Sequence, residues 1–216
     1  TWGTATSPVV YNNYLLVDVG GDGDYGFVAF DKKSGNVVWK TKTDLQGYST
    51  PVVITVNDVK LALDFTGNKL VSVNPETGKW YWSLPWRTSY DVNAATPVFV
   101  APDKVFISSG YNVGAALLQI NAGNGKASVK QIWKSRVMRN QYATSLLLGD
   151  YLYGFDEKKF KCINAFTQEE KWVTRGFGKG SATYADGHII LLSERGKLVL
   201  IEATPELYVE KASAQM

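Results

Sequence analysis

The stretch "AFDKKSGNVVW", residues 29–39, decides the fold. It places an acid, Asp31, and a small hydroxyl, Ser34, before a glycine, Gly35, and a tryptophan, Trp39. An aspartate side chain can accept hydrogen bonds from the backbone N–H groups of a tight turn, and glycine supplies the positive φ that such a turn requires. The stretch therefore predicts a turn between two strands, the second of which carries a large aromatic side chain.

Four weaker copies of this stretch follow along the chain. They are "SVNPETGKWYW" from Ser72, "QINAGNGKASVKQIW" from Gln119, "CINAFTQEEKW" from Cys162 and "LIEATPELYVE" from Leu200. The third tryptophan arrives four residues late, Gln168 replaces the fourth glycine, and the fifth copy keeps only Glu202. The five acid or amide positions are separated by 43, 47, 43 and 38 residues. A period in this range is typical of repeat architectures.

Each repeat contains four short apolar runs. In the second repeat these are "PVVITV", "VKLALDF", "KLVSV" and "KWYWS", separated by turn-forming "ND", "TGN" and "NPETG". No amphipathic helical run interrupts them. Four antiparallel strands every 40 to 50 residues predict an all-β chain folded as a β-propeller. The expected blades span roughly residues 1–43, 44–86, 87–136, 137–175 and 176–216, and strands near 6–11, 50–56, 96–100, 143–148 and 180–185 line the channel.

The repeated tryptophan falls on the outermost strand of its blade. There it can lie flat against the neighbouring blade and cover the seam between the two. We therefore expect a structural role for the whole repeated set. Its members are Asp31, Gly35, Trp39, Asn74, Gly78, Trp82, Asn121, Gly125, Trp133, Asn164 and Trp172.

The repeat resembles a known family at this point. The pattern A-x-D-x-x-S/T-G-x-x-x-W is similar to the tryptophan-docking motif of pyrroloquinoline-quinone (PQQ)-like propellers and is matched best at residues 29–39. Stretches such as "WRTSYDVNAATP" and "KSRVMRNQYATS" are also similar to bacterial PQQ-like repeat proteins. That superfamily includes quinoprotein dehydrogenases and the propeller lipoprotein of the outer-membrane barrel-assembly machinery. The resemblance therefore implies a fold and leaves the function open.

The resemblance also bears on completeness and location. PQQ-like propellers usually close with seven or eight blades, so five blades imply part of a longer ring. The remaining blades would come from the rest of the chain or from another chain, and a closed five-bladed ring is the alternative. A periplasmic or extracytoplasmic location is expected, with the signal sequence outside the given chain.

Composition excludes two classes of partner. The 216 residues are 45% hydrophobic, which is ample for a β core, and 23 basic against 20 acidic residues give no bias toward a polyanion. We therefore expect no nucleic-acid partner. No apolar run approaches the length of a membrane helix, so no membrane span is predicted.

Three candidates for chemistry have ordinary structural explanations. Cys162, the only cysteine, is expected to be a small buried filler, and His188, the only histidine, a plain strand residue. Asp18, Asp22 and Asp24 lie among glycines in "DVGGDGDYG", but their spacing does not match that of a calcium-binding loop. We expect a turn there.

The connections between blades, and the turns between the second and third strands of each blade, crowd one side of a propeller, here called the loop face. These segments mix arginine, asparagine and aromatic residues, which suits recognition. The alternative is that their side chains tie adjacent blades together. The predicted binding face comprises Arg87, Tyr90, Asp91, Asn93, Arg136, Arg139, Asn140, Tyr142, Asp156, Lys179 and Arg195, with Glu157 and Glu194 on the same loops.

Two functions are compatible with this sequence. The first is a non-catalytic scaffold that binds a protein or a saccharide through the loop face. The second is a PQQ-dependent dehydrogenase of alcohols or sugars, which needs calcium and an aspartate base. The resemblance implies an adjacent cysteine pair in such an enzyme, and this chain has one cysteine. The scaffold is favoured, and no cofactor is expected for it.

Overall fold

Five four-stranded sheets make up the protein. The computed structural model describes residues 3, 5–20, 25–43 and 45–216. Within these residues every sheet is an antiparallel meander and no segment is helical. The predicted all-β class and the five four-stranded blades are confirmed.

The strands of each blade follow one another in sequence. In the first blade they are β1 (Val9–Tyr11), β2 (Tyr14–Asp18), β3 (Phe27–Asp31) and β4 (Val37–Thr41). In the second they are β5 (Val52–Val56), β6 (Val59–Phe65), β7 (Lys69–Val73) and β8 (Trp80–Pro85). In the third they are β9 (Val98–Val100), β10 (Lys104–Ser109), β11 (Gly114–Gly123) and β12 (Lys126–Ser135). In the fourth they are β13 (Leu146–Leu148), β14 (Tyr151–Asp156), β15 (Lys159–Asn164) and β16 (Glu170–Arg175). In the fifth they are β17 (Ser181–Ala185), β18 (His188–Leu192), β19 (Lys197–Glu202) and β20 (Glu210–Gln215).

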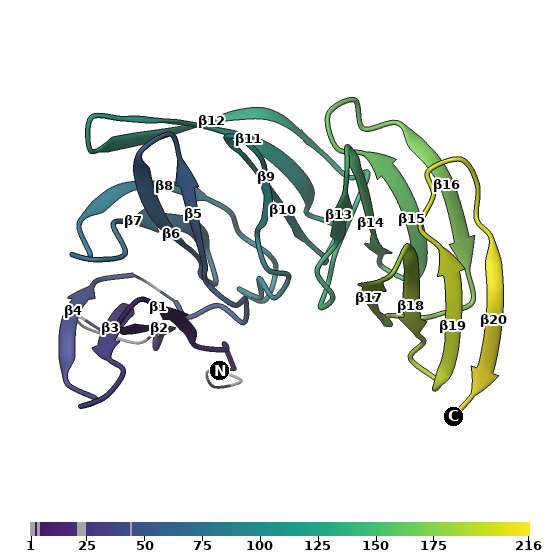
Figure 1. Ribbon diagram of the computed structural model, residues 1–216, viewed down its shortest axis with the longest axis horizontal. Helices are drawn as coiled ribbons and strands as arrows, with labels where there is room; N and C mark the ends of the chain where they lie inside the picture. The colour runs from purple at the N-terminus through teal and green to yellow at the C-terminus, as the bar shows by residue number, and fades with distance from the viewer. Residues whose placement is uncertain (1–2, 4, 21–24, 44) are drawn as a thin grey trace.

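The blades stand side by side in an arc, with the first and the fifth at its two ends (Figure 1). The first strand of each blade lies on the inner side of the arc and the fourth strand on the outer side (Figure 1). Each inner strand, β1, β5, β9, β13 and β17, falls inside one of the five runs that the sequence predicted.

The hydrophobic core lies between the blades. Alternate residues of a strand point to opposite faces of its sheet, so a blade with two neighbours buries both faces. In the second blade, Leu61, Leu63 and Phe65 pack against the third blade, whereas Ala62 and Val71 pack against the first. Separate apolar clusters fill the seams between the third and fourth and between the fourth and fifth blades.

Three tryptophans join their blade to the next one. The indole Nε1 of Trp39 donates a hydrogen bond of 3.1 Å to the carbonyl of Pro75, and Trp133 and Trp172 donate to Ala165 and Thr204. Each acceptor lies just after the third strand of the following blade. The donor and the acceptor of each bond therefore lie at equivalent positions of successive repeats.

Two of the repeated glycines, Gly35 and Gly78, have different structural roles. Gly78 has a φ of 68°, and a Cβ placed on it would lie 2.6 Å from Cε3 of Trp39. Only glycine lets the indole of the preceding blade lie this close to the turn. Gly35 has a φ of 73° but open space around it, so only its backbone conformation matters.

The predicted side-chain caps are present in three turns. Asp31 Oδ1 accepts hydrogen bonds from the N–H groups of Lys33 and Ser34 and from the Ser34 hydroxyl. These bonds, led by the one from the backbone of Ser34, lower the pKa of Asp31. Asn74 and Asn164 cap their turns through Oδ1 in the same way.

The third blade departs from the prediction. Asn121 was expected to cap a turn, but it lies within β11 and pairs with Ser128 of β12. The turn lies further along at Asn124 and Gly125, whose positive φ values of 53° and 67° are those of a tight hairpin. The four extra residues lengthen both strands, which is why the third tryptophan is late.

The lengthened hairpin changes the preceding seam. Ala122, Ala127 and Val129 of the hairpin pack onto the core of the second blade, where Trp82 also lies. Trp82 is buried, and its Nε1 has no hydrogen-bond partner within the described part of the chain. The second seam therefore replaces the indole hydrogen bond with apolar contact to a longer hairpin.

Candidate functional site

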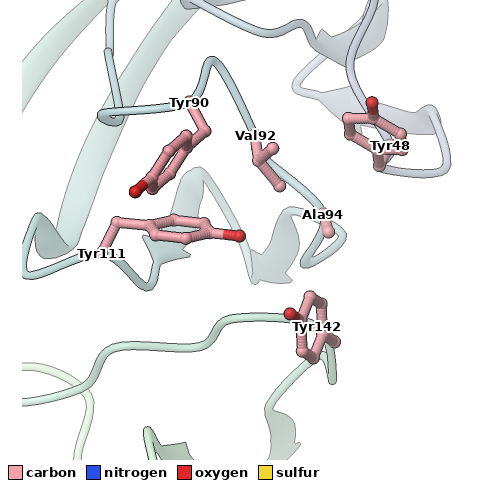
Figure 2. Close-up of a pocket in the computed structure, with 6 residues that line it drawn as sticks. All are labelled: Tyr48, Tyr90, Val92, Ala94, Tyr111 and Tyr142. Atoms are coloured by element: carbon pink, nitrogen blue, oxygen red, sulfur yellow. The ribbon is translucent and has the colours of Figure 1, made fainter. Parts of the chain in front are cut away.

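A pocket lined mainly by tyrosines lies on the loop face. It has a volume of about 410 Å³. Figure 2 shows the tyrosine rings around it, with Val92 and Ala94 on one connecting segment. This group is called the tyrosine pocket, and its lining residues are Tyr48, Tyr90, Val92, Ala94, Tyr111 and Tyr142.

The tyrosine pocket is assembled from segments that are distant in sequence. Tyr48 lies between β4 and β5, Tyr90 between β8 and β9, and Tyr142 between β12 and β13. Tyr111 lies in the turn between β10 and β11, with a φ of 54°. Three successive inter-blade connections and one turn therefore converge here, as the propeller topology predicts for a loop face.

The pocket offers aromatic faces and hydroxyl edges. The rings of Tyr90 and Tyr111 meet edge to face with centroids 5.2 Å apart. Tyr90 and Tyr142 are 67% and 56% exposed, so both are accessible to a ligand. Partial burial and the adjacent Tyr111 raise the pKa of Tyr142, and none of the described lining residues is charged at neutral pH. Such a surface suits an apolar or ring-shaped group.

Asn93 holds two of the tyrosine-bearing segments in place. Its buried side-chain amide donates hydrogen bonds to the carbonyls of Thr66, Gly67 and Trp86, and its Oδ1 accepts one from the Ser109 hydroxyl at 2.6 Å. Its backbone carbonyl accepts a hydrogen bond from the N–H of Tyr48. This predicted binding residue therefore supports the pocket from beneath.

Asn140 does the same for the segment that carries Tyr142. The Asn140 amide donates to the carbonyl of Phe155 at 2.9 Å, and its Oδ1 accepts from the Ser145 hydroxyl. The hydroxyl of Ser108, in the third blade, accepts a hydrogen bond from the Asn140 backbone N–H. Asn140 is 1% exposed, so its side chain does not reach the surface.

Asn93→Ala should therefore lower stability and disturb the pocket indirectly. The substitution leaves the buried carbonyls and the Ser109 hydroxyl without their partner, and we expect a loss of roughly 2–3 kcal/mol in the free energy of unfolding. Denaturant unfolding measures this loss. Arg87→Ala, an exposed change on the same connection, is the control and should cost almost nothing. Equal stability of the two variants would contradict the supporting role.

Two more predicted binding residues form a partly buried ion network. Arg139 binds Asp156 through Nε at 2.6 Å and through Nη2 at 3.2 Å. Lys161 contacts the same carboxylate at 3.0 Å and Glu170 at 2.8 Å. Burial alone would raise the pKa of Asp156, but hydrogen bonds from Arg139 and Lys161 outweigh it and hold that pKa below its usual value. This network ties the fourth blade to the connection that precedes it.

The other predicted residues lie closer to solvent. Arg87, Asp91 and Arg136 are exposed, and Lys179 places its Nζ 5.7 Å from the ring centre of Tyr142. Arg195 lines a second pocket on the loop face. The sequence did not single out Tyr48, Val92, Ala94 or Tyr111, although all four lie on the inter-blade connections or second-to-third-strand turns that were predicted to form this face.

Two of the remaining candidates for chemistry, Cys162 and His188, lie on strands. Cys162 is buried, and burial raises the pKa of its thiol to about 11, so little reactive thiolate forms. His188 is half-buried in β18, where Nδ1 lies 2.6 Å from the carbonyl of Asp186. Asp18 is buried, whereas Asp22 and Asp24 lie outside the described residues. Among the residues that the structure describes, no group of three or more histidine, cysteine or acidic side chains could hold a metal ion.

The chain matches one family model and is similar in fold to several solved structures. The family model described as outer membrane protein assembly factor BamB matches residues 2–174. BamB from Moraxella catarrhalis has a TM-score of 0.68 at 15% identity, over 97% of this chain and 63% of BamB. The Cps50 (Swd1) β-propeller domain of Myceliophteria thermophila has a TM-score of 0.61 at 12% identity, over 100% of this chain and 73% of that domain. A europium-containing methanol dehydrogenase has a TM-score of 0.66 at 9% identity, over 99% of this chain and 51% of the enzyme.

The two kinds of comparison carry different weight. At these identities the solved structures show a shared fold alone, and the chain spans less than two thirds of the Moraxella protein. The search of curated proteins gave no match. No helix in the described part of the chain is long and apolar enough to cross a membrane. The family match covers most of the sequence, and the chain therefore belongs to the PQQ-like repeat family whose model bears the name of the assembly factor BamB.

Proposed function

We propose that the protein is a non-catalytic scaffold that binds a partner protein through the tyrosine pocket on its loop face. The observation that supports this most is the convergence of four tyrosines on a pocket of about 410 Å³ with no charge among its described lining residues. Tyrosine is enriched where proteins recognise one another, because it contributes a large rigid surface and a polar tip. The family name, that of an assembly factor, agrees with a protein partner. A saccharide ring is the alternative ligand.

The dehydrogenase alternative draws on the likeness to a methanol dehydrogenase. Calcium requires several oxygen ligands, with carboxylates prominent among them. The described lining of the tyrosine pocket provides phenols and aliphatic side chains, and no cluster of three or more acidic, histidine or cysteine residues occurs in the ranges described. These residues do not fit a calcium-assisted quinone site, so we derive no catalytic step from them.

The proposal also concerns the fifth blade, one face of which carries apolar side chains that no other described blade covers. Ile190, Leu198 and Leu200 on the fifth blade line a further pocket of about 310 Å³, and Leu192 of the same blade is 42% exposed. Because the other seams bury such residues against a neighbouring blade, we propose that another blade, from this chain or from a second one, covers this face. Tryptophan docking would join the blades, and a periplasmic or otherwise extracytoplasmic location would suit a BamB-like scaffold.

Site-specific photo-crosslinking tests the scaffold. A photoreactive residue at position 90 should give a covalent adduct with a discrete partner protein in cells, and Tyr142→Ala should reduce that adduct strongly. The same probe at Tyr184, an exposed residue outside the pocket, should give none. If position 90 yields no adduct while position 184 does, the loop face is not the binding surface.

A cofactor assay tests the alternative. Incubation with PQQ and calcium, followed by dye reduction with a panel of alcohols and sugars, should show no turnover if the protein is a scaffold. Stoichiometric PQQ binding with alcohol-dependent dye reduction would replace the scaffold with the enzyme.

A further inference from the structure

Two further pockets lie beside the tyrosine pocket on the loop face, and neighbouring pockets share a lining residue. The next one, of about 360 Å³, shares Tyr142 with the tyrosine pocket and extends past Lys179 to Glu194. A third, of about 430 Å³, shares Glu194 with the second. The three together are called the loop-face groove. Its lining residues come from the connections of the first three blades and from the fourth and fifth blades.

The far end of the loop-face groove is strongly basic. Lys158, Lys159, Arg175 and Arg195 line the third pocket, and Glu194 is the single acid among its described lining residues. Such a concentration of positive charge is notable in a chain whose formal net charge is only +3. Salt bridges in the described structure involve other residues, so these four cations have no carboxylate partner there.

Glu194, the one acid among the described lining residues of this pocket, already accepts a hydrogen bond from the backbone. Glu194 Oε2 accepts a weak hydrogen bond of 3.4 Å from the backbone N–H of Lys179. A Cβ on Gly178 would lie 2.3 Å from the same oxygen, so the glycine permits this approach. Glu194 therefore contacts the segment that connects the fourth and fifth blades. Its single negative charge cannot neutralise four cations. Buried Phe177 completes the pocket with an apolar surface.

We infer that the loop-face groove binds an extended acidic peptide segment of the partner, with an aromatic or aliphatic side chain in the tyrosine pocket and carboxylates at the four cations. This inference rests on the proposed scaffold function and names the chemistry of its partner. Arginine and lysine side chains bind carboxylates by charge-assisted hydrogen bonds, and arginine can do so with two parallel bonds. The aromatic end and the basic end together require a ligand that is apolar at one point and acidic at another.

The groove favours a peptide over the other polyanions. A nucleic acid carries phosphates along its whole length, whereas the described lining of the tyrosine pocket has no charge to meet them. An acidic saccharide carries hydroxyls along its whole length, and the phenol groups are the only side-chain hydrogen-bond partners among the described lining residues of the tyrosine pocket. A peptide can vary its side chains along the strand and so match both ends.

Fluorescence anisotropy with synthetic peptides tests the inference. The probes carry one tryptophan and three glutamates, separated by flexible spacers of graded length, and matched peptides replace either the tryptophan by alanine or the glutamates by lysine. We expect binding only with both elements present and weakening with added salt. The double variant Lys159→Glu/Arg195→Glu should weaken binding at least tenfold, and Lys130→Glu, on the outer strand β12, should leave it unchanged.

The remaining outcomes separate the two proposals. Binding of an oligogalacturonate or of a single-stranded oligonucleotide, with no binding of any peptide, would overturn the acidic-peptide inference. Equal binding by the double variant, or no binding by any probe, would overturn it as well. The photo-crosslink at position 90 judges the scaffold independently: an adduct that persists in the double variant leaves the scaffold standing without its acidic partner.

Discussion

Trp39→Ala should lower the free energy of unfolding by about 3–5 kcal/mol, the range measured for truncating a buried large aromatic. Trp39 is 7% exposed, packs edge to face on Phe27 with ring centroids 5.6 Å apart, and donates to the carbonyl of Pro75. Alanine would leave a cavity in the first seam, and Gly78 would lose the ring that covers it. Denaturant unfolding monitored by circular dichroism measures the loss.

Two matched variants locate the source of that effect. Trp80→Ala removes a tryptophan that is 38% exposed, and we expect a cost below about 1 kcal/mol. Trp39→Phe keeps much of the apolar contact and removes the indole N–H, so it should cost an intermediate amount. If Trp39→Ala were no more harmful than Trp80→Ala, the indole would not stabilise the seam.

The fold could be predicted because its determinants are local. Asp31 with Gly35, and Asn74 with Gly78, specify turns within five residues, and the alternating apolar runs around them specify strands. Repetition then supplies the long-range information, because each blade must bury its faces against copies of itself. The repetition of one local pattern is therefore enough to predict the propeller architecture.

The third blade shows where this reasoning fails. Asn121 and Gly125 match the repeat by spacing, yet the inserted residues change the hairpin and place Asn121 in a strand. The sequence pair Asn124-Gly125 is itself a strong signal for a two-residue turn. Two competing turn patterns overlapped, and the tight hairpin prevailed because it extends the backbone ladder by further pairs.

The site was harder to predict than the fold, since it is formed by loops that meet only in space. Polar loop residues are ambiguous in sequence: Asn93 and Asn140 are buried supports, whereas Tyr90 and Tyr142, close to them in the chain, face the pocket. Sequence places all four on the loop face. Which side chain turns inward depends on carbonyls of other blades, and no local pattern reports those.

The seam between the first two blades contains an unusual pair of acids. Asp18 and Asp64 are both fully buried and lie on the faces that the two blades turn toward each other. Asp18 accepts hydrogen bonds from the N–H groups of Gly20 and Gly47, whereas neither carboxylate oxygen of Asp64 has a partner among the described residues. At the next seam, Phe65 and Ile107 pack in an apolar cluster instead.

This pair should make the protein less stable as the pH rises from about 4 through about 6. Burial raises the pKa of Asp18 from 3.8 to about 6, and burial followed by repulsion from Asp18 raises the pKa of Asp64 well above its usual value. The folded state thus binds more protons than the unfolded chain above about pH 4, so stability falls with increasing pH. The Asp18 shift alone corresponds to a loss of about 3 kcal/mol, complete above about pH 6.

Asp64→Asn should remove much of this penalty. The amide cannot ionise, which removes both the buried charge at position 64 and its repulsion with Asp18, so we expect a higher melting temperature at about pH 8 and little change at about pH 4.5. Thermal unfolding across this range measures the effect. Asp58→Asn, an exposed change in the turn between β5 and β6, is the control and should leave the profile as it was. A melting temperature of unaltered protein that rises steadily from about pH 4.5 to 8 would contradict the argument, because the folded state would then bind fewer protons than the unfolded chain.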